Sequence, residues 1–371
     1  MSAKNKKILF IVQLPPPVHG VSLMNHYAIN NPHWMGIYRV KVLPLNFVKS
    51  LNDIGRVSVG KLFKFIGFLF KLIYALVAFK PDMVYFTIMP TGKIFYRDAL
   101  CVFVIKLFGP NLIVHLHGKG INEEAEKSFV KMWVYKKVFR KTHIICLSES
   151  LQKDVNKVYK GQPFILPNGI ASFEKTEKFE NKVPVILYLS NLVKSKGIEV
   201  LLESLVELNK KNINFEAKIV GNSADLSIEE VKEFCREKQL DHKVHILGPK
   251  YGDDKRSVLY HSDIFILPSF NECFPLSILE AMQAELAIIS TKVGGIPDMI
   301  QNNINGMLIN PNDSKDLEQK IMTMISNKDL RRSLGCHAYN DFQNKYTLDQ
   351  FHFGLATIFN KVLETKSDLK N

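Results

Sequence analysis

The chain has 371 residues, more than one hydrophobic core usually serves, so two domains of about 150–200 residues each are expected. Hydrophobic residues at 46% and charged residues at 23% are typical of a globular protein and exclude a disordered or collagen-like chain. Residues 1–180 hold 26 basic and 11 acidic side chains, a net +15, whereas residues 181–371 hold 23 and 25, a net −2. The basic half is expected to meet a membrane surface, a nucleic acid or a phosphorylated ligand.

Cysteine usage and targeting signals indicate the compartment. The five cysteines are an odd number without C-x-x-C spacing, so they predict neither a disulfide framework nor a zinc site. The apolar run at residues 8–12 is too short for a signal peptide and is expected to form a strand. A cytoplasmic protein with reduced thiols is therefore predicted.

The most membrane-like segment is residues 59–79, VGKLFKFIGFLFKLIYALVAF. Its lysines, Lys61, Lys64 and Lys71, lie within about 80° of one another on a helix, and a spanning helix would tolerate them poorly. Two interpretations stay open: a core-facing helix with one solvated stripe, or an interfacial helix at an anionic membrane surface. The second makes the protein peripheral on the inner face of the plasma membrane.

Short apolar runs alternate with helical patterns, which predicts an α/β protein with parallel sheets. In the first half, strands are expected at residues 7–12, 40–45, 83–87, 112–116, 143–147 and 164–166, with helices near 21–30, 60–79, 94–108, 124–139 and 149–158. In the second half, strands are expected at residues 185–189, 216–220, 244–247, 264–267 and 287–290, with a helical tail from about 313. The interpretation is two Rossmann-like domains facing each other across a cleft.

The domain boundaries follow from composition. Residues 1–167 form the expected N-terminal domain, and the polar stretch 168–182 lacks apolar periodicity and is expected to be a linker. Residues 183–345 form the expected C-terminal domain, and residues 346–371 are expected to be a helix that crosses back to the N-terminal domain.

Two carboxylates follow the strand DIFILP, and ligands of open α/β sheets bind at such strand ends. Glu272 lies in the loop and Glu280 in the second turn of the next helix, with the free amides of Phe274, Leu276 and Ser277 between them. A nucleotide-sugar presents sugar hydroxyls, diphosphate and ribose hydroxyls in that order. The alternative is that both glutamates are ordinary charges near a helix start, favoured by its dipole.

Two further turns belong to the first half. In PPPVHG, Gly20 at a helix start would let a phosphate approach the backbone, although a proline-rich loop can be a rigid connector. In VHLHGKG, His115 and His117 point to the same side of a strand, so at least one of them could be a packed core histidine. This turn lacks the third glycine of a dinucleotide fingerprint, because Glu123 occupies that position.

The segments SFNECFPLSILEAM, IISTKVGGIPDMI and NGMLINPND resemble the C-terminal domain of retaining GT-B glycosyltransferases, specifically glycosyltransferase family 4 (glycosyl transferases group 1). Glu272 and Glu280 match the E-x7-E motif of that family. The resemblance implies that Glu272 binds donor-sugar hydroxyls and that Glu280 binds the ribose. It also implies that the amides of Phe274, Leu276 and Ser277 hold the phosphates.

The same resemblance assigns residues elsewhere. Lys196 matches the lysine that neutralises the pyrophosphate, while Asn191 stands where the family has arginine, so Lys194 or an N-terminal residue would replace that charge. His117 matches a histidine near the reacting sugar carbon and is expected to donate a hydrogen bond. Glu285 stands where the family has glycine, which implies a different turn or modest strain.

The function implied is retaining transfer of a sugar from a UDP- or GDP-sugar to a glycan or lipid-linked acceptor, in bacterial cell-surface polysaccharide synthesis. Neither a metal nor a cofactor is expected, because the chain has no D-x-D motif and no cluster with metal-ligand spacing. Nucleic acid is not an expected partner, because only four of the 26 cations in the basic half are arginine. A retaining glycosidase, a nucleotide-sugar epimerase and a non-enzymatic basic binding protein stay open as alternatives.

Overall fold

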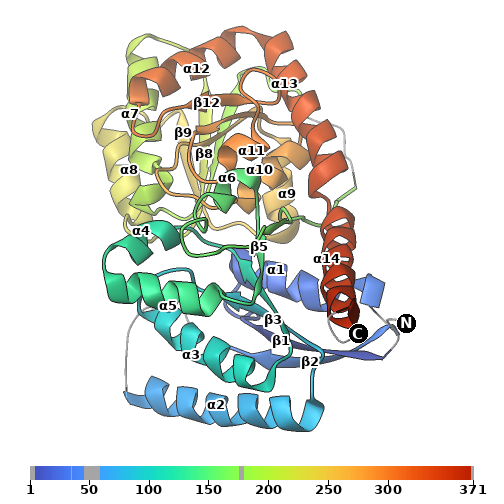
Figure 1. Ribbon diagram of the computed structural model, residues 1–371. Coiled ribbons are helices and arrows are strands. Elements are labelled where there is room, and N and C mark those ends of the chain that lie inside the picture. The colour runs from blue at the N-terminus through green and yellow to red at the C-terminus, as the bar shows by residue number, and fades with distance from the viewer. Residues whose placement is uncertain (1–4, 35, 46–58, 175–178, 369–371) are drawn as a thin grey trace. The chain divides into compact units, whose positions relative to one another are not determined.

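The computed structural model describes residues 5–34, 36–45, 59–174 and 179–368 (Figure 1). The chain divides into two compact units: the first comprises Met1–Asn168 and Leu348–Asn371, and the second comprises Gly169–Thr347. Each unit contains a six-stranded sheet in which every described strand pair is parallel. The predicted α/β class with two Rossmann-like domains is confirmed. Residues 175–178 of the expected linker lie outside the described residues.

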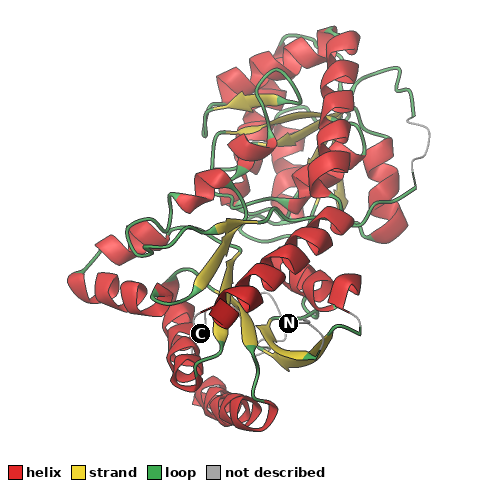
Figure 2. Cartoon of the chain, turned by 45° about the vertical axis from the view of Figure 1, so that its right-hand side comes forward, coloured by secondary structure: helices red, strands yellow, loops and turns green. Residues whose placement is uncertain are grey.

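The first unit packs helices on both faces of its sheet, whose strand order is β2-β1-β3-β4-β5-β6. Helices α2, α3 and α5 cover one face, and α1 and α14 cover the other (Figures 1 and 2). The elements are β1 (Lys6–Val12), α1 (Gly20–Ile29), β2 (Tyr38–Pro44), α2 (Val59–Phe79), β3 (Met83–Ile88), α3 (Gly92–Phe108), β4 (Asn111–Leu116), α4 (Ile121–Glu126), α5 (Phe129–Phe139), β5 (His143–Cys146), α6 (Glu149–Gln152), β6 (Phe164–Ile165) and α14 (Leu348–Asp368), with a 3-10 turn at Pro32–Trp34.

Apolar packing joins α14 to the remainder of the first unit. The rings of Trp34 and Phe359 stack with centroids 4.9 Å apart, and both side chains are almost fully buried. Asn31 Nδ2 donates to the carbonyl of His352 at 2.8 Å. Burying two large aromatic side chains contributes several kcal/mol, so this contact fixes the C-terminal helix on the sheet.

The second unit has the strand order β12-β11-β10-β7-β8-β9. Its elements are β7 (Val185–Leu189), a 3-10 turn (Lys194–Lys196), α7 (Ile198–Lys210), β8 (Glu216–Val220), α8 (Ile228–Glu237), β9 (Val244–Gly248), α9 (Gly252–Tyr260), β10 (Ile264–Leu267), α10 (Leu276–Gln283), β11 (Ala287–Thr291), α11 (Ile296–Met299), β12 (Met307–Ile309), α12 (Ser314–Ser326) and α13 (Lys328–Asp341), followed by a π-helical turn (Phe342–Tyr346).

Both sheets reverse the direction of strand addition once. In the second unit the chain builds outward from β7 to β9 and then returns to place β10 beside β7. In the first unit it moves from β1 to β2 and then returns to place β3 beside β1. Ligands of open α/β sheets bind at such switch points, beyond the carboxyl ends of the strands. The loops that follow β7, β10, β1 and β3 are therefore the positions at which a site is expected.

The structure corrects three sequence predictions. The helix expected at residues 124–139 is two helices, α4 and α5, because Ser128 caps a new start by accepting a hydrogen bond from the Lys131 amide. The helix expected at 149–158 is helical only over the four residues of α6 and continues as turns. The short strand β12 was not predicted.

Candidate active site

The loop after β7 carries Lys196 at the switch point of the second unit. Gly197 ends the 3-10 turn with a φ of 76°, and a Cβ at this position would lie 2.0 Å from the carbonyl oxygen of Pro268. Only glycine therefore allows this loop to approach the end of β10 so closely. The Phe270 amide donates to the Ser195 carbonyl at 2.8 Å, which joins the loops that follow β7 and β10.

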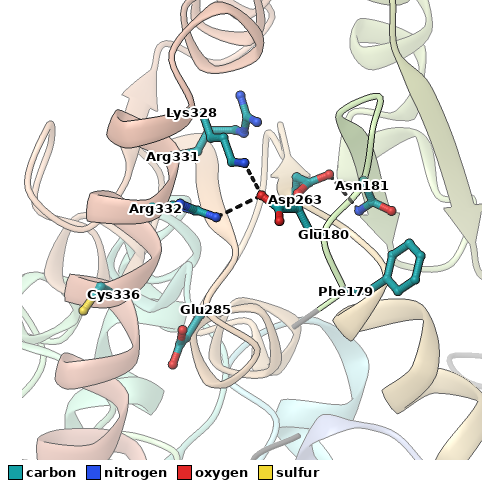
Figure 3. Close-up of a pocket in the computed structure, with 9 residues that line it drawn as sticks. All are labelled: Phe179, Glu180, Asn181, Asp263, Glu285, Lys328, Arg331, Arg332 and Cys336. Atoms are coloured by element: carbon teal, nitrogen blue, oxygen red, sulfur yellow. Dashed lines mark hydrogen bonds and ion pairs between the residues drawn. The ribbon is translucent and has the colours of Figure 1, made fainter. Parts of the chain in front are cut away.

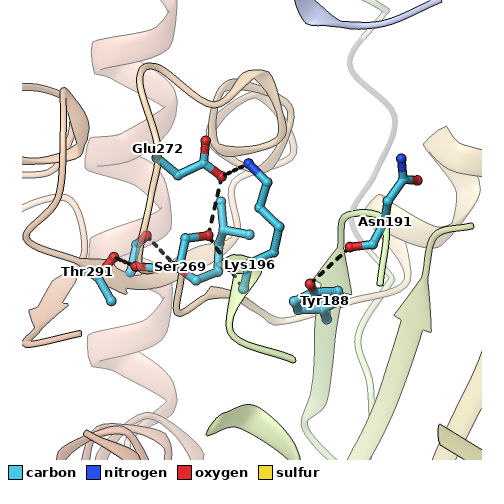
Figure 4. Close-up of polar contacts among 8 residues, drawn as sticks. Tyr188, Asn191, Lys196, Ser269, Glu272 and Thr291 are labelled. Carbon is cyan, nitrogen blue, oxygen red and sulfur yellow. Dashed lines mark hydrogen bonds and ion pairs between the residues drawn. The ribbon is translucent and has the colours of Figure 1, made fainter. Parts of the chain in front are cut away.

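Lys196 and Glu272 form an ion pair at this junction (Figure 4). Nζ of Lys196 lies 2.6 Å from Oε1 of Glu272, and the Ser269 hydroxyl donates to the same carboxylate oxygen at 3.3 Å. The Glu272 side chain is 9% exposed and that of Lys196 is 28% exposed. The pair is thus largely enclosed but open on the side of the lysine.

The backbone around Glu272 is held from two sides. The Thr291 hydroxyl donates to the Ser269 carbonyl at 2.6 Å, and the Gly295 amide donates to the Cys273 carbonyl at 2.8 Å. Gly294 has a φ of 56°, and a Cβ there would lie 2.0 Å from the Glu272 carbonyl oxygen. Gly294 therefore allows β11 and its loop to support the Glu272 loop.

Helix α10 begins directly after that loop. Pro275 is its N-cap residue rather than part of its first turn, and no side chain caps the helix. The amides of Leu276 and Ser277 belong to the first turn, where helical geometry supplies no intrahelical acceptor. Phe274 is buried and its ring contacts Tyr346 at 5.9 Å, so the side chain anchors the helix start while its backbone precedes the first turn.

Glu280 has a partner that the sequence interpretation missed. Nζ of Lys255, in α9, lies 2.5 Å from Oε1 of Glu280, with side-chain exposures of 30% and 18%. The start of α10 is therefore flanked by two lysine–glutamate pairs, Lys196–Glu272 and Lys255–Glu280. Little in the sequence indicates that Lys255 pairs with Glu280, because the two residues lie 25 positions apart and belong to different helices.

Asn191 and Lys194 do not join these ion pairs. Oδ1 of Asn191 accepts from the Asn222 amide at 3.2 Å, so the side chain links the loops that follow β7 and β8. Nζ of Lys194 lies 3.4 Å from Glu199 in an exposed pair, which directs its charge toward the first turn of α7. In the described residues, Lys255 rather than Lys194 provides the second cation beside α10.

Glu285 adopts the conformation that glycine usually takes at this point, with a φ of 55°. Of the two expectations, a different turn or modest strain, this φ favours modest strain, since a non-glycine residue in the left-handed region costs about 1–2 kcal/mol.

A separate cavity of about 320 Å³ lies at the amino ends of β7 and β10, away from both lysine–glutamate pairs (Figure 3). Asp263 Oδ2 accepts from Asn181 Nδ2 at 2.9 Å, and Glu180 forms ion pairs with Lys328 and Arg332 of α13. These pairs join the segment before β7 to α13 and neutralise the cations, so the cavity is best explained as structural.

The first unit gathers buried polar side chains at its own switch point. His19 caps α1: its Nδ1 accepts from the Ser22 amide at 3.4 Å, and its amide donates to the Ser22 hydroxyl at 2.9 Å. Gly20 is the first residue of that helix and is exposed. Asn25 Nδ2 donates to the Gln13 carbonyl and to the Thr87 hydroxyl, at 2.9 Å and 3.1 Å.

The two histidines after β4 differ in environment. His115 is fully buried, and its Nδ1 lies 2.6 Å from the Tyr85 hydroxyl, as expected of a packed core histidine. The His117 ring lies 4.1 Å from that of His115, and its Nε2 is enclosed without a hydrogen-bond partner among the described residues. Burial, and then the charge of His19, lowers the pKa of His117 to about 3. His117 is therefore neutral near pH 7 and can act as a hydrogen-bonding group rather than as a cation.

Over residues 5–34, 36–45, 59–174 and 179–368, no three His, Cys, Asp or Glu side chains are placed to hold a metal ion together.

The chain is similar to known glycosyltransferases. Residues 170–341 match the family described as "Glycosyl transferases group 1". The capsular polysaccharide biosynthesis glycosyltransferase CapM of Staphylococcus aureus is 26% identical over 269 residues, covering 66% of this chain and 70% of that protein. The N,N'-diacetylbacillosaminyl-diphospho-undecaprenol alpha-1,3-N-acetylgalactosaminyltransferase of Campylobacter jejuni is 29% identical over 205 residues, covering 54% and 50%. The glycosyltransferase MJ1178 of Methanocaldococcus jannaschii is 25% identical, and the match spans 59% of each chain.

Solved structures extend the likeness to almost the whole chain. A glycosyltransferase from Rickettsia africae superposes with a TM-score of 0.76 at 21% identity, covering 97% of this chain and 99% of that one. Anabaena Alr3699/HepE in complex with UDP-glucose superposes with a TM-score of 0.72 at 19% identity, covering 96% and 99%. At these identities the likeness establishes the fold. Residues 170–341 therefore resemble the group 1 glycosyltransferases, and the chain has the two-domain GT-B fold.

Proposed function

We propose that the protein is a retaining glycosyltransferase that transfers a sugar from a UDP- or GDP-sugar to a glycan or lipid-linked acceptor. The observation that carries the proposal is the pair of lysine–glutamate contacts, Lys196–Glu272 and Lys255–Glu280, on either side of the uncapped start of α10. Cations and free amides bind a diphosphate, and carboxylates accept hydrogen bonds from sugar and ribose hydroxyls.

The donor is held by exchange of these contacts. Lys196 leaves Glu272 for the diphosphate, and Glu272 then accepts hydrogen bonds from donor-sugar hydroxyls in place of the lysine. The amides of Leu276 and Ser277 hold phosphate oxygens, with the backbone of Phe274 beside them, and Glu280 accepts from the ribose. Lys196 and Glu272 thus each exchange one partner for another, so that neither stays desolvated and unpaired.

The chemistry then proceeds on one face of the sugar. The bond between the anomeric carbon and the diphosphate oxygen breaks, and its electron pair stays on the diphosphate. The acceptor oxygen bonds to the anomeric carbon, and its proton passes to the departing diphosphate, so the anomeric configuration is retained. Lys196 and the α10 amides stabilise the charge that develops on the diphosphate, and no metal ion is needed for this step.

Two features of the first unit could contact a substrate. Neutral His117 donates or accepts a hydrogen bond near the reacting carbon, since its low pKa keeps it from acting as a general acid near pH 7. Gly20 and the α1 amides are available to a phosphate or hydroxyl of either substrate, because glycine has no side chain to obstruct approach.

The names of the relatives support the substrate classes. CapM is named for capsular polysaccharide biosynthesis, the Campylobacter jejuni enzyme for a diphospho-undecaprenol-linked acceptor, and the HepE structure contains UDP-glucose. By analogy we place this protein in bacterial cell-surface polysaccharide synthesis, in the cytoplasm.

A thermal-shift screen with UDP- and GDP-sugars tests donor binding, because a ligand at 100 times its Kd adds roughly 2.7 kcal/mol of stability. The positive donor is then incubated with acceptor glycans, and the anomeric configuration of the product is determined by NMR. Conversion of the donor without an acceptor would indicate an epimerase, and cleavage of glycosides without a nucleotide-sugar would indicate a glycosidase. No shift with any nucleotide-sugar would overturn the proposal.

A further inference from the structure

The outward surface of α2, α3 and α5 in the first unit is unusually apolar. These helices cover one face of the first sheet, and their other sides face away from it (Figures 1 and 2). Of the 20 large hydrophobic side chains that are exposed in the described residues, 13 lie on these three helices. That concentration is too high for scattered surface residues and indicates an interaction surface.

Helix α2 has two apolar stripes. Its inner stripe, which includes Phe68 and Leu72, is buried against the remainder of the unit. The outer stripe repeats every three or four residues and spans an arc of about 100°, roughly opposite the inner one. Its members are exposed by 39–69%: Phe63, Ile66, Phe70, Ile73, Tyr74 and Val77. The helix is therefore not a core-facing helix with a purely solvated outer side.

Helices α3 and α5 extend the surface. Leu107, near the end of α3, is 84% exposed. In the first turns of α5, Phe129 is 85% exposed, Val130 68% and Trp133 51%. Because exposed apolar side chains lie on three neighbouring helices, they form a broad layer and not a single stripe.

The charge on this layer has one sign. Lys64 and Lys71 border the outer stripe of α2, and Lys136 and Lys137 follow Trp133 on α5. The single acidic residue in the sequences of the three helices is Asp98, which is 1% exposed and bonded to Arg97. The side chain of Lys61, the third expected lysine, lies outside the described side chains.

We propose that α2, α3 and α5 form a docking surface for an anionic lipid bilayer, with the apolar side chains at the acyl boundary and the lysines at the headgroups. A second copy of the chain fits this surface poorly, because a symmetric contact would bring cations against cations. No described helix is both long and apolar enough to cross a membrane, so the contact is peripheral. The proposal rests on the proposed function in one respect: a lipid-linked acceptor would be presented at the membrane surface to which these helices bind.

The protein carries its own reporter for the test. It has two tryptophans, of which Trp34 is 2% exposed and Trp133 is half exposed beneath Lys137, whose Nζ lies 5.4 Å from the ring centroid. Vesicles of phosphatidylcholine with about 30% phosphatidylglycerol should shift the emission of Trp133 to shorter wavelength, and brominated lipids should quench it. The Trp133→Phe variant, which keeps Trp34, is the control and should show neither change.

Flotation with the same vesicles measures binding. Phe63→Ser with Phe70→Ser should weaken binding about tenfold or more, whereas Ile304→Ser with Phe353→Ser, two exposed positions elsewhere, should leave it unchanged. Lys64→Glu with Lys71→Glu should weaken binding to anionic vesicles about 30-fold or more, and salt should weaken binding by the native chain.

The proposal would be overturned if the native chain did not bind vesicles, or if the Phe63→Ser/Phe70→Ser variant bound them as well as the native chain does. It would also be overturned if the native chain formed a dimer that does not bind vesicles and that becomes monomeric in this variant. The vesicle assays contain no donor and the thermal-shift screen contains no lipid, so failure here is distinguishable from failure of the proposed function.

Discussion

Lys196→Ala tests the donor site most directly, because it removes the cation from an enclosed ion pair. Nζ of Lys196 lies 2.6 Å from Glu272, whose side chain is only 9% exposed. Among the described residues, the other hydrogen bond to this carboxylate comes from the Ser269 hydroxyl at 3.3 Å. The variant therefore leaves an ionised group with one long hydrogen bond and little access to water.

The expected loss of stability follows from that geometry. The gross attraction at this separation is about 6 kcal/mol at an effective dielectric constant of about 20. Water that enters the vacated space offsets most of it, so we expect a net loss of about 1–3 kcal/mol in the free energy of unfolding. A loss of about 2 kcal/mol lowers the Tm by about 4–8 °C in a unit of this size.

A matched control lies in the same unit. Nζ of Lys211 also lies 2.6 Å from a glutamate, Glu318, whose side chain is also 9% exposed. Lys211→Ala should therefore cost a similar amount of stability without touching the donor site. Only Lys196→Ala should also weaken donor binding, by about 10- to 150-fold, the worth of a hydrogen bond to a charged group.

Urea unfolding followed by circular dichroism measures stability, and calorimetric titration with UDP and GDP measures affinity. Nucleotide affinity that is the same in Lys196→Ala and Lys211→Ala would refute the assignment of Lys196 to the diphosphate. Undiminished stability of Lys196→Ala would refute the account of the ion pair itself.

Three further variants test the remaining assignments. Glu280→Gln should mainly raise the donor KM in initial-rate kinetics, because the ribose contact is the same in ground and transition states, and a change confined to the acceptor KM would contradict the ribose role. Burial lowers the pKa of His117 from 6.5 to about 3. As the pH falls from about 6.5 to about 3, this histidine is therefore protonated in the unfolded chain but not in the folded chain, and the free energy of unfolding decreases. The urea midpoint of His117→Gln should therefore fall less steeply below about pH 6.5 than that of the native chain, and equal slopes would count against it. Gly294→Ala should lower the free energy of unfolding by about 2–4 kcal/mol, because the added Cβ would meet the Glu272 carbonyl. Gly248→Ala is the control: its φ of 65° is similar, but no atom lies nearer than 3.8 Å to the added Cβ, so the loss should be about 1 kcal/mol. Equal losses in urea unfolding would mean that the contact with the Glu272 carbonyl is unimportant.

Local sequence patterns were sufficient for most of the fold. Eleven strands were predicted because their apolar runs are bounded by polar or turn residues, as at ILFIV in β1 and IFIL in β10. The strand β12 was missed because three residues, Met307–Ile309, are too few to show a period. The break between α4 and α5 depends on the cap at Ser128, which a continuous helical pattern conceals.

The candidate site was only partly predictable, for a different reason. Glu272 and Glu280 lie within one loop and helix, so their spacing is visible in the sequence. Lys255 pairs with Glu280 only because the sheet order brings the start of α9 close to α10, and no local pattern contains that information. Periodicity likewise shows that α2 has apolar residues on two sides, but tertiary packing decides which side is buried.

The difference in net charge between the halves has a structural explanation. In the second unit the lysines beside α10 are already paired with glutamates, so a near-neutral domain can still offer two cations when a diphosphate displaces the carboxylates. Such exchange favours a ligand that brings both phosphates and hydroxyls over a simple anion. In the first unit Lys64 and Lys71 of α2 and Lys136 and Lys137 of α5 border exposed apolar side chains and have no acidic neighbour on those helices, so their charge acts outward. Lys131 of α5 is instead paired with Glu124 of α4. Lysines that are paired with glutamates beside α10 thus serve selective ligand binding, whereas lysines without an acidic neighbour on their helix serve attraction to an anionic surface.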